Sequence, residues 1–274
     1  MKVGYEHGQN PDTLEGAAAR RLLSRGRNMK IDYDHGQNRH TLQGAAVALS
    51  SLLGSNVPKS LLDVGCGTGT WLRAAADLGV SEVFGVDGIV PTGSLHISKD
   101  LIERRDLSTT FNLARRFDIA LCLEVAEHLP EHSAGNLIMS IVAHSDVVLF
   151  SAACPGQPGQ HHVNCQWPTY WQKMFNQHGF ACEESARWRI WNDDRIEPWY
   201  RQNVFWARLD PSKAGHEPRL QPVIHPGMFD AMSRGHYDRA IREVEMGGFP
   251  IRWYSKLLKR AFLRKIAKPL APQN

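Results

Sequence analysis

Apolar runs alternate with amphipathic segments along the middle of the chain. Short, nearly continuous apolar runs are typical of strands buried on both faces of a sheet, and apolar residues three and four positions apart are typical of helices. The pattern predicts strands at Ser60–Val64, Glu82–Val86, Leu101–Arg105, Phe117–Leu123, Asp146–Phe150, Ala181–Arg189 and Asn203–Arg208. It predicts helices at Thr41–Leu53, Thr70–Leu78, Ser133–Ala143, Pro168–His178 and Met228–Glu245. This alternation indicates an α/β fold with a buried parallel sheet and helices on both faces.

The sequence divides into three parts. Residues 1–38 form an N-terminal extension, residues 39–210 the α/β domain, and residues 211–274 a Pro-, Gly- and His-rich linker followed by a basic helical tail. The extension contains a duplication: YEHGQNPDTLEGAA at Tyr5–Ala18 returns as YDHGQNRHTLQGAA at Tyr33–Ala46. Two copies are too few for a repeat array with a shared core. We interpret the first copy as a duplicated extension, with a binding role for both HGQN turns as the alternative.

Composition places the chain among ordinary globular proteins. Of its 274 residues, 42% are hydrophobic and 22% are charged. No apolar run approaches the ~20 residues of a membrane span, and MKVGYEHGQNPD lacks the apolar core of a secretory signal, so we expect a cytoplasmic protein. The five cysteines form no CxxC pair and are interpreted as reduced thiols. A net charge of +4 does not by itself indicate nucleic-acid binding.

Three glycines follow the first predicted strand directly. LLDVGCGTGT places Gly65, Gly67 and Gly69 before a helix, where glycine lets the backbone approach a ligand and the helix N-terminus favours a negative group. The dinucleotide-binding pattern GxGxxG would have its third glycine at Thr70, so this turn departs from that pattern. We expect Asp63, just before the turn, to hold either a ligand's ammonium group or the turn's own amides.

Two further acidic residues follow the next two strands. Asp87 lies 22 residues after Gly65, the distance at which an acidic residue meets ribose hydroxyls. Asp106 follows the third strand, where its carboxylate and the next amide could read an adenine edge. Each acid alone is also typical of a turn or a helix cap. Because Asp63, the glycine turn, Asp87 and Asp106 follow one another at the ends of successive strands, the set favours a bound ligand over a plain strand–helix turn.

This segment resembles the class I S-adenosylmethionine-dependent methyltransferases. The resemblance rests on LDVGCGTG at 62–69, GVDG at 85–88, RRDL at 104–107 and FDIALCLEVAEHL at 117–129, and it covers about residues 40–208. It implies a Rossmann-like sheet of seven mostly parallel strands, the last two forming an antiparallel hairpin. Outside this segment, we expect small helical extensions at both ends of the chain. The resemblance also implies S-adenosyl-L-methionine as the cofactor. The residues expected to bind it are Asp63, Gly65, Cys66 and Gly67 at the methionine end, Asp87 and Gly88 at the ribose, Asp106 and Leu107 at the adenine, and Glu124 near the methyl group.

Two polar clusters are expected at the carboxyl edge of the sheet, where open α/β sheets bind ligands. The first follows the fourth strand and the second follows a Gly/Pro-rich loop after the fifth. They consist of Glu124, Glu127 and His128, and of His161, His162 and Asn164.

These clusters allow three interpretations. A hydroxyl acceptor usually needs a general base near neutral pKa, and His128, His161 and His162 are the candidates. The second interpretation is a divalent metal site formed by Glu124, Glu127, His128 and His162. ExxEH is similar to the motif of small-RNA 2′-O-methyltransferases and of ubiquinone-pathway O-methyltransferases, where it is associated with a metal, although many metal-free methyltransferases also carry it. In the third interpretation, Glu127 and His128 have only a structural role, as packing residues or as the start of a helix.

Six of the eight tryptophans lie within residues 167–206. RWRIWNDDRIEPWYRQN at 187–203 falls between the last two strands, where many class I enzymes carry a substrate-binding insertion. Trp and Arg together suit sugar rings, flat aromatics or bases, and packing of a lid is the alternative. The residues expected to contact the acceptor are Asn164, Trp191, Arg195, Trp199 and Tyr200.

The C-terminal tail is strongly basic. WYSKLLKRAFLRKIAK at 253–268 holds six Lys or Arg and no acid, with apolar residues at roughly helical spacing. Such a helix could pack on the domain, lie on an anionic membrane surface, or touch nucleic-acid phosphates.

Together these features predict an S-adenosylmethionine-dependent methyltransferase. We expect O-methylation of a small molecule or saccharide with a His general base. The alternatives are an RNA methyltransferase, metal-assisted through ExxEH, and a non-catalytic cofactor-binding partner protein. The glycine spacing disfavours a dehydrogenase. The motifs specify the cofactor and say very little about the acceptor.

Overall fold

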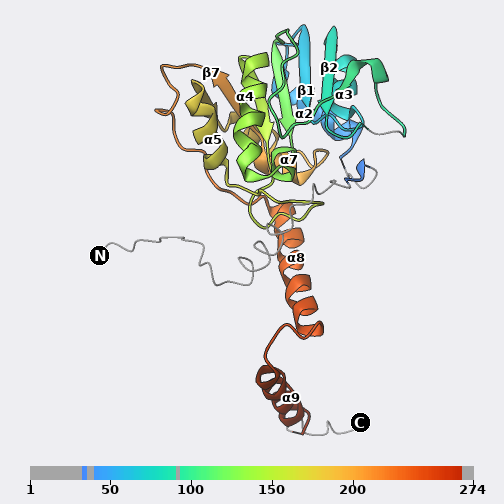
Figure 1. The fold of residues 1–274 in the computed structure, drawn as a ribbon, viewed down its shortest axis with the longest axis vertical. Helices are drawn as coiled ribbons and strands as arrows, with labels where there is room; N and C mark the ends of the chain where they lie inside the picture. The colour runs from blue at the N-terminus through green and yellow to red at the C-terminus, as the bar shows by residue number, and fades with distance from the viewer. Residues whose placement is uncertain (1–32, 36–39, 91–92, 267–274) are drawn as a thin grey trace. The chain divides into compact units, whose positions relative to one another are not determined.

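The computed structural model describes residues 33–35, 40–90 and 93–266 (Figure 1). The first HGQN copy lies outside the described residues, and so do residues 36–39 of the second copy. Most of the predicted N-terminal extension, residues 1–38, is therefore outside them too.

Seven strands form one sheet in the order β3-β2-β1-β4-β5-β7-β6. Neighbouring strands from β3 to β5 pair in parallel, and β7 runs antiparallel to both β5 and β6. This order confirms the predicted Rossmann-like sheet of seven mostly parallel strands. The strands are β1 (Ser60–Val64), β2 (Glu82–Asp87), β3 (Ile102–Arg104), β4 (Ile119–Leu123), β5 (Val147–Ser151), β6 (Phe180–Glu183) and β7 (Phe205–Leu209).

Helices separate most of the strands along the chain. The α-helices are α2 (Leu42–Leu53), α3 (Thr70–Leu78), α4 (Ala134–His144), α5 (Pro168–Gln177), α6 (Ser185–Ile190), α7 (Pro198–Asn203), α8 (Pro226–Glu245) and α9 (Ile251–Ile266). Short 3-10 helices are η2 (Lys99–Leu101), η3 (Ala126–His128) and η4 (Glu131–Ser133). Thr41 caps α2 by accepting a hydrogen bond from the Gly44 N–H at 2.9 Å, which satisfies an otherwise unpaired donor.

The sheet separates two apolar cores. Because side chains alternate along a strand, Leu62 of β1 packs into the core with α4 and α5, and Leu61 packs into the core with α2, α3, α6 and α7. Figure 1 shows α4 and α5 lying along one face of the sheet. Since both faces are covered, a ligand has access to the sheet at the ends of its strands.

One predicted strand is partly wrong. Residues 181–189 were expected to be extended, but β6 ends at Glu183 and α6 follows. Helical spacing explains the difference, because the Glu184 carboxylate lies 3.5 Å from Arg187 and accepts a hydrogen bond from Trp188 Nε1 at 3.1 Å. The last two strands are antiparallel as expected, and α6 and α7 lie between them in the sequence, where an insertion was predicted.

The segment predicted as a linker packs on the domain instead. Leu220 and His225 are buried. The Leu220 N–H donates to Gln172 Oε1 at 2.9 Å, and the His225 N–H donates to Gln202 Oε1 at 2.8 Å. A composition rich in Pro and Gly indicated irregular structure here, but it did not reveal these anchors.

Candidate active site

The glycine turn begins at the carboxyl end of β1. Gly65, Gly67 and Gly69 have φ values of +84°, +52° and +80°, a region that favours glycine. A Cβ added to Gly65 would lie 2.3 Å from Val125, and one added to Gly69 would lie 2.6 Å from Ile97. The turn therefore needs glycine both for its backbone conformation and for close packing.

Asp87, at the end of β2, holds the turn in place. Its Oδ2 accepts a hydrogen bond from the Gly67 N–H, and its Oδ1 accepts one from the Ile89 N–H, both at 2.8 Å. Each carboxylate oxygen retains a further lone pair, so the group can still accept a ligand hydroxyl. Asp87 thus links the predicted ribose position to the glycine turn.

Asp63 is buried beside this turn and lacks a counter-charge. Its Oδ2 has no hydrogen-bond partner among the described residues. Burial, with a smaller contribution from the charge of Asp87, raises the pKa of Asp63 to about 8. The Gly65 and Cys66 amides donate to Val86 O and the Gly67 amide to Asp87, so the carboxylate of Asp63 does not hold these three amides of the turn.

The other predicted cofactor residues have different surroundings. Gly88 follows Asp87 directly, and the Cys66 thiol is buried against Gly85, so only the backbone of Cys66 belongs to the turn. Leu107 is part of the apolar core. Asp106 is exposed, and its Oδ1 accepts hydrogen bonds from Ser108 N–H and Oγ–H at 2.9 and 2.6 Å. That local turn is the alternative role considered for Asp106.

His35, from the second HGQN copy, lies against the same turn. The ring Nε2 hydrogen-bonds Ile89 O at 2.7 Å and lies 3.9 Å from Asp87 Oδ1. A Cβ on Gly67 would lie 3.1 Å from the imidazole of His35. The neighbouring Asp34 exchanges two hydrogen bonds with Gln160, of 3.3 and 3.0 Å. This segment therefore connects the glycine turn with the loop that carries the second polar cluster.

Glu124 follows β4 directly in a left-handed conformation, with φ of +55°. Such a conformation is strained for a residue with a side chain and is concentrated at functional sites. Its carboxylate accepts hydrogen bonds from Gln157 Nε2 at 2.7 Å and Asn203 Nδ2 at 3.1 Å. Burial raises the pKa of Glu124 to about 7 despite these donors. The sequence did not indicate Gln157 or Asn203, because isolated polar amides are common at the surface of a protein. Only the fold brings these two amides to Glu124.

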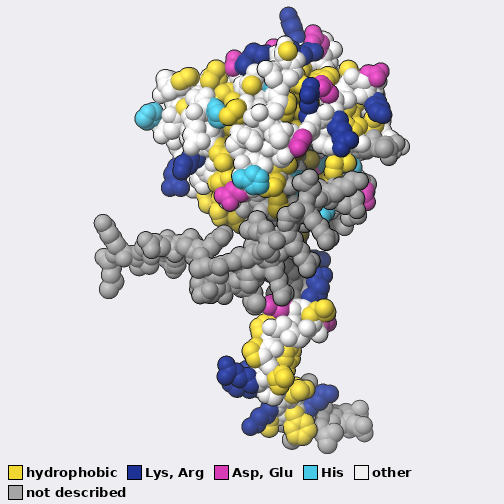
Figure 2. Space-filling model, viewed as in Figure 1, with side chains coloured by type: hydrophobic (Ala, Val, Ile, Leu, Met, Phe, Trp, Pro, Cys, Tyr) yellow, Lys and Arg dark blue, Asp and Glu magenta, His cyan; other side chains and the backbone are white. Residues whose placement is uncertain are grey.

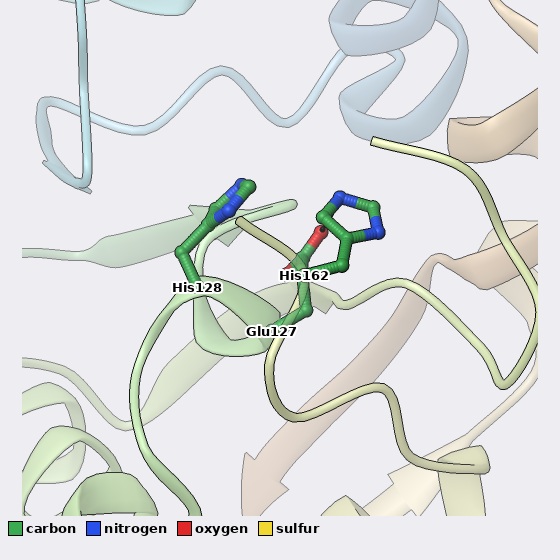
Figure 3. A group of neighbouring side chains, drawn as sticks. All are labelled: Glu127, His128 and His162. Atoms are coloured by element: carbon green, nitrogen blue, oxygen red, sulfur yellow. Dashed lines mark ion pairs between the residues drawn. The ribbon is translucent and has the colours of Figure 1, made fainter. Parts of the chain in front are cut away.

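Glu127, His128 and His162 form a compact group (Figure 3). One ligand atom from each lies within 4.8 Å of the others, and the two imidazoles flank the Glu127 carboxylate. Glu127 O accepts hydrogen bonds from the Val163 and Asn164 N–H groups at 2.9 and 3.0 Å, which joins η3 to the second cluster. The two clusters predicted to meet at this edge do meet.

Charge is poorly compensated inside this group. Burial, and then the charge of Glu124, raises the pKa of Glu127 well above its usual range, and among the described residues its carboxylate has only the His162 imidazole, 4.0 Å away, as a possible counter-charge. Burial and then His162 lower the pKa of His128 to about 4, and burial lowers that of His162. The site thus favours neutral imidazoles beside a carboxyl group that lacks a fixed counter-charge.

The second cluster separates into different environments. His162 Nδ1 lies 3.0 Å from Gln157 O, so Nδ1 carries the proton and Nε2 carries the lone pair. His161 is exposed, has φ of +47°, and lies outside the compact group. Asn164 is buried, and its Nδ2 has no hydrogen-bond partner among the described residues, so it offers a donor to a ligand.

The predicted acceptor residues of the Trp-rich insertion do not converge. Tyr200 is buried in the core and accepts a hydrogen bond from Trp71 Nε1 at 3.3 Å. Arg195 forms an ion pair with Asp193 at 2.6 Å on the surface. Trp191 lies beside His225, with ring centroids 4.5 Å apart and the rings tilted by 59°, and Trp199 packs beside Tyr200. Tyr200 and Arg195 therefore have structural partners, and we do not retain them as acceptor contacts.

Comparison with known proteins identifies the family. A family model described as a methyltransferase domain matches residues 37–192, more than half of the chain. The chain belongs to this methyltransferase family, as its motifs indicated. No curated protein sequence matches the chain.

Solved structures with a similar fold are distant in sequence. The methyltransferase domain of bacterial CtHen1 is 16% identical, with a TM-score of 0.44 over 62% of this chain and 100% of that one. The plantazolicin methyltransferase BpumL, in complex with a pentazolic desmethylPZN analog and SAH, is 15% identical, with a TM-score of 0.46 over 71% and 95%. Magnesium protoporphyrin IX methyltransferase from Synechocystis PCC 6803, with bound SAH, is 18% identical, with a TM-score of 0.40 over 61% and 81%.

Proposed function

We propose that this methyltransferase binds S-adenosylmethionine at the glycine turn and transfers its methyl group to a hydroxyl of a small molecule or saccharide. The observation that supports the acceptor chemistry best is the group of Glu127, His128 and His162 at the carboxyl edge of the sheet. This edge also carries the glycine turn and Asp87, so cofactor and acceptor would meet where open α/β sheets bind ligands.

The cofactor proposal rests on unsatisfied and available polar groups. The ammonium group of S-adenosylmethionine would supply the counter-charge that the buried Asp63 Oδ2 lacks. The ribose hydroxyls would donate to the remaining lone pairs of Asp87, and His35 would close the turn beside them. The positive φ values of the glycines keep the turn free of side chains, so the cofactor can approach its backbone.

His162 is the general base in this proposal. Because its Nδ1 donates to Gln157 O, its Nε2 lone pair is free to accept the proton of an acceptor hydroxyl. Glu127 Oε1 lies 4.0 Å from Nε2, and an imidazolium at His162 would in turn favour the charged form of Glu127, which burial otherwise disfavours. The acceptor oxygen forms a bond to the methyl carbon as the sulfur–carbon bond breaks, and the hydroxyl proton passes to His162. His128, with its strongly lowered pKa, is the weaker base.

A metal-assisted version of the same reaction is the second candidate. Glu127, His128 and His162 place one oxygen and two nitrogen ligands within 4.8 Å of one another, a donor set that suits a divalent cation. A cation would also satisfy the two buried Glu127 oxygens, with Glu124 as a further predicted ligand. When bound, it would supply Lewis acidity toward the acceptor hydroxyl.

The acceptor class is tested by methyl transfer to a panel of compounds. The full chain is incubated with methyl-labelled S-adenosylmethionine and, separately, with saccharides, small hydroxylated aromatics and a short RNA, and the products are analysed by mass spectrometry. We expect an O-methylated saccharide or small molecule. Labelled RNA would favour the RNA alternative, and tight cofactor binding without transfer to any acceptor would favour a non-catalytic partner role.

A further inference from the structure

The C-terminal helix α9 carries a dense positive charge. Its 16 residues contain six Lys or Arg, at positions 252, 256, 259, 260, 264 and 265, and no Asp or Glu. No ion pair of the described residues involves α9. The helix therefore presents a field that attracts anionic partners.

Large apolar side chains of α9 are exposed. Ile251 is 87% exposed, Leu258 72% and Phe262 67%. Figure 2 shows hydrophobic side chains together with Lys and Arg along this part of the chain. Trp253 and Tyr254 are only partly exposed, because Trp253 stacks on Phe249 with ring centroids 4.5 Å apart and Tyr254 donates to Val244 O at 2.7 Å. Soluble proteins rarely expose so many large apolar side chains together, so this part of α9 is typical of a surface that contacts a partner molecule or a membrane.

The apolar and basic residues lie on opposite sides of the helix. At about 3.6 residues per turn, one side carries Ile251, Tyr254, Leu258, Ala261 and Phe262. The opposite side carries Arg252, Lys256, Lys259 and Arg260. The separation is incomplete, since Leu263 lies among the basic residues and Lys265 among the apolar ones. An amphipathic helix with a basic face is typical of segments that lie in a membrane interface.

No described helix is long and apolar enough to cross a membrane.

We propose that α9 binds the surface of a membrane containing anionic phospholipids, with Leu258 and Phe262 entering the lipid and the basic side contacting the headgroups. Charge complementarity selects this partner. Nucleic acid would neutralise the basic side but leave the apolar side in water. A second copy of α9 would cover the apolar side but would gather six positive charges from each helix without a single acid. An anionic membrane satisfies both sides at once, and this inference does not depend on which acceptor is methylated.

Vesicle co-sedimentation of the full chain tests the proposal. We expect binding to vesicles of phosphatidylglycerol and phosphatidylcholine, weakening as salt rises, and little binding to phosphatidylcholine alone. The double variant Leu258→Ser/Phe262→Ser keeps the charge and should lose affinity at least about tenfold. Lys256→Gln/Arg260→Gln should also bind more weakly and show less dependence on salt.

Phe229→Ser is the matched control, because Phe229 of α8 is 62% exposed but lies outside the basic helix. It should bind vesicles like the unmodified chain, and unchanged S-adenosylmethionine binding by each variant would show that it folds. Equal vesicle binding by all variants would overturn the proposal. The proposal would also be overturned if the chain does not bind anionic vesicles but uses α9 to bind RNA or to form a dimer.

Discussion

His162 Nε2 lies 4.0 Å from Glu127 Oε1, and Nε2 carries a lone pair because Nδ1 donates to Gln157 O. Two lone pairs at this separation do not attract each other, so the pair is stabilised when a proton or a metal cation comes between them. The first case is general-base catalysis and the second is metal-assisted catalysis. Under the proposed function, the same pair of residues would act in either case.

Replacing His162 should slow methyl transfer without affecting the cofactor. His162→Ala removes the proposed base, which usually costs about 10²–10⁴-fold in rate, while the glycine turn and Asp87 remain intact. Turnover and the Kd for S-adenosylmethionine, measured on the same preparation, separate the two effects. His161→Ala is the matched control, because His161 is exposed and outside the group, and it should stay active. A fully active His162→Ala enzyme would rule out both proposed roles of His162.

Metal dependence distinguishes the two versions of the reaction. If the cation is used, treatment with a strong chelator should abolish turnover, and Mg²⁺ or Mn²⁺ should restore it. Calorimetry with Mn²⁺ should then show a site that Glu127→Gln weakens by at least about tenfold, since even an indirect metal contact is worth that much. Activity that survives the chelator, with no Mn²⁺ binding, would leave His162 acting as a base alone.

Gly159 should prove necessary for the position of the His162 ring. A Cβ at Gly159 would lie 2.1 Å from His162 Nε2, so Gly159→Ala must displace the imidazole. A displacement of about 1 Å can cost about a hundredfold in rate, and we expect kcat to fall with little change in cofactor affinity. Gly135→Ala is the control, because nothing lies within 4 Å of its added Cβ. Equal kcat values for the two variants would contradict the geometry.

His35→Ala should weaken S-adenosylmethionine binding. The variant removes the hydrogen bond to Ile89 O and the ring beside Asp87, and one such interaction is worth roughly three- to tenfold in affinity. His216→Ala removes an exposed imidazole and should have no effect. Thermal unfolding of both variants checks the fold. Unchanged affinity in His35→Ala would mean that the second HGQN copy only packs against the turn.

The glycine turn was predictable because its features are local. Gly65, Gly67 and Gly69 are required by a left-handed backbone, and Asp87 occurs at a fixed distance after them. The alternation of apolar runs was likewise sufficient for the order of strands and helices. It failed at α6, where side-chain pairs at helical spacing decide the conformation of a short polar segment.

The acceptor side was predictable only as a set of candidates. The sequence could not distinguish His161 from His162, because the difference comes from the backbone: His161 adopts a left-handed conformation and is exposed, while the next residue, His162, is partly buried. Gln157, in a loop, and Asn203, at the end of α7, are 33 and 79 residues away from Glu124 in the sequence, so no local pattern marks them. Tyr200 looked like a pocket residue because burial in the core is not visible from composition.

Calorimetric titration of the full chain with S-adenosylmethionine, beside a titration with a nicotinamide dinucleotide, tests the central claim most directly. We predict that S-adenosylmethionine binds at one site, that the dinucleotide does not bind, and that Asp87→Ala weakens the first titration sharply because the turn loses the acceptor of its Gly67 amide. Absence of S-adenosylmethionine binding, or equal binding by Asp87→Ala, would contradict the account.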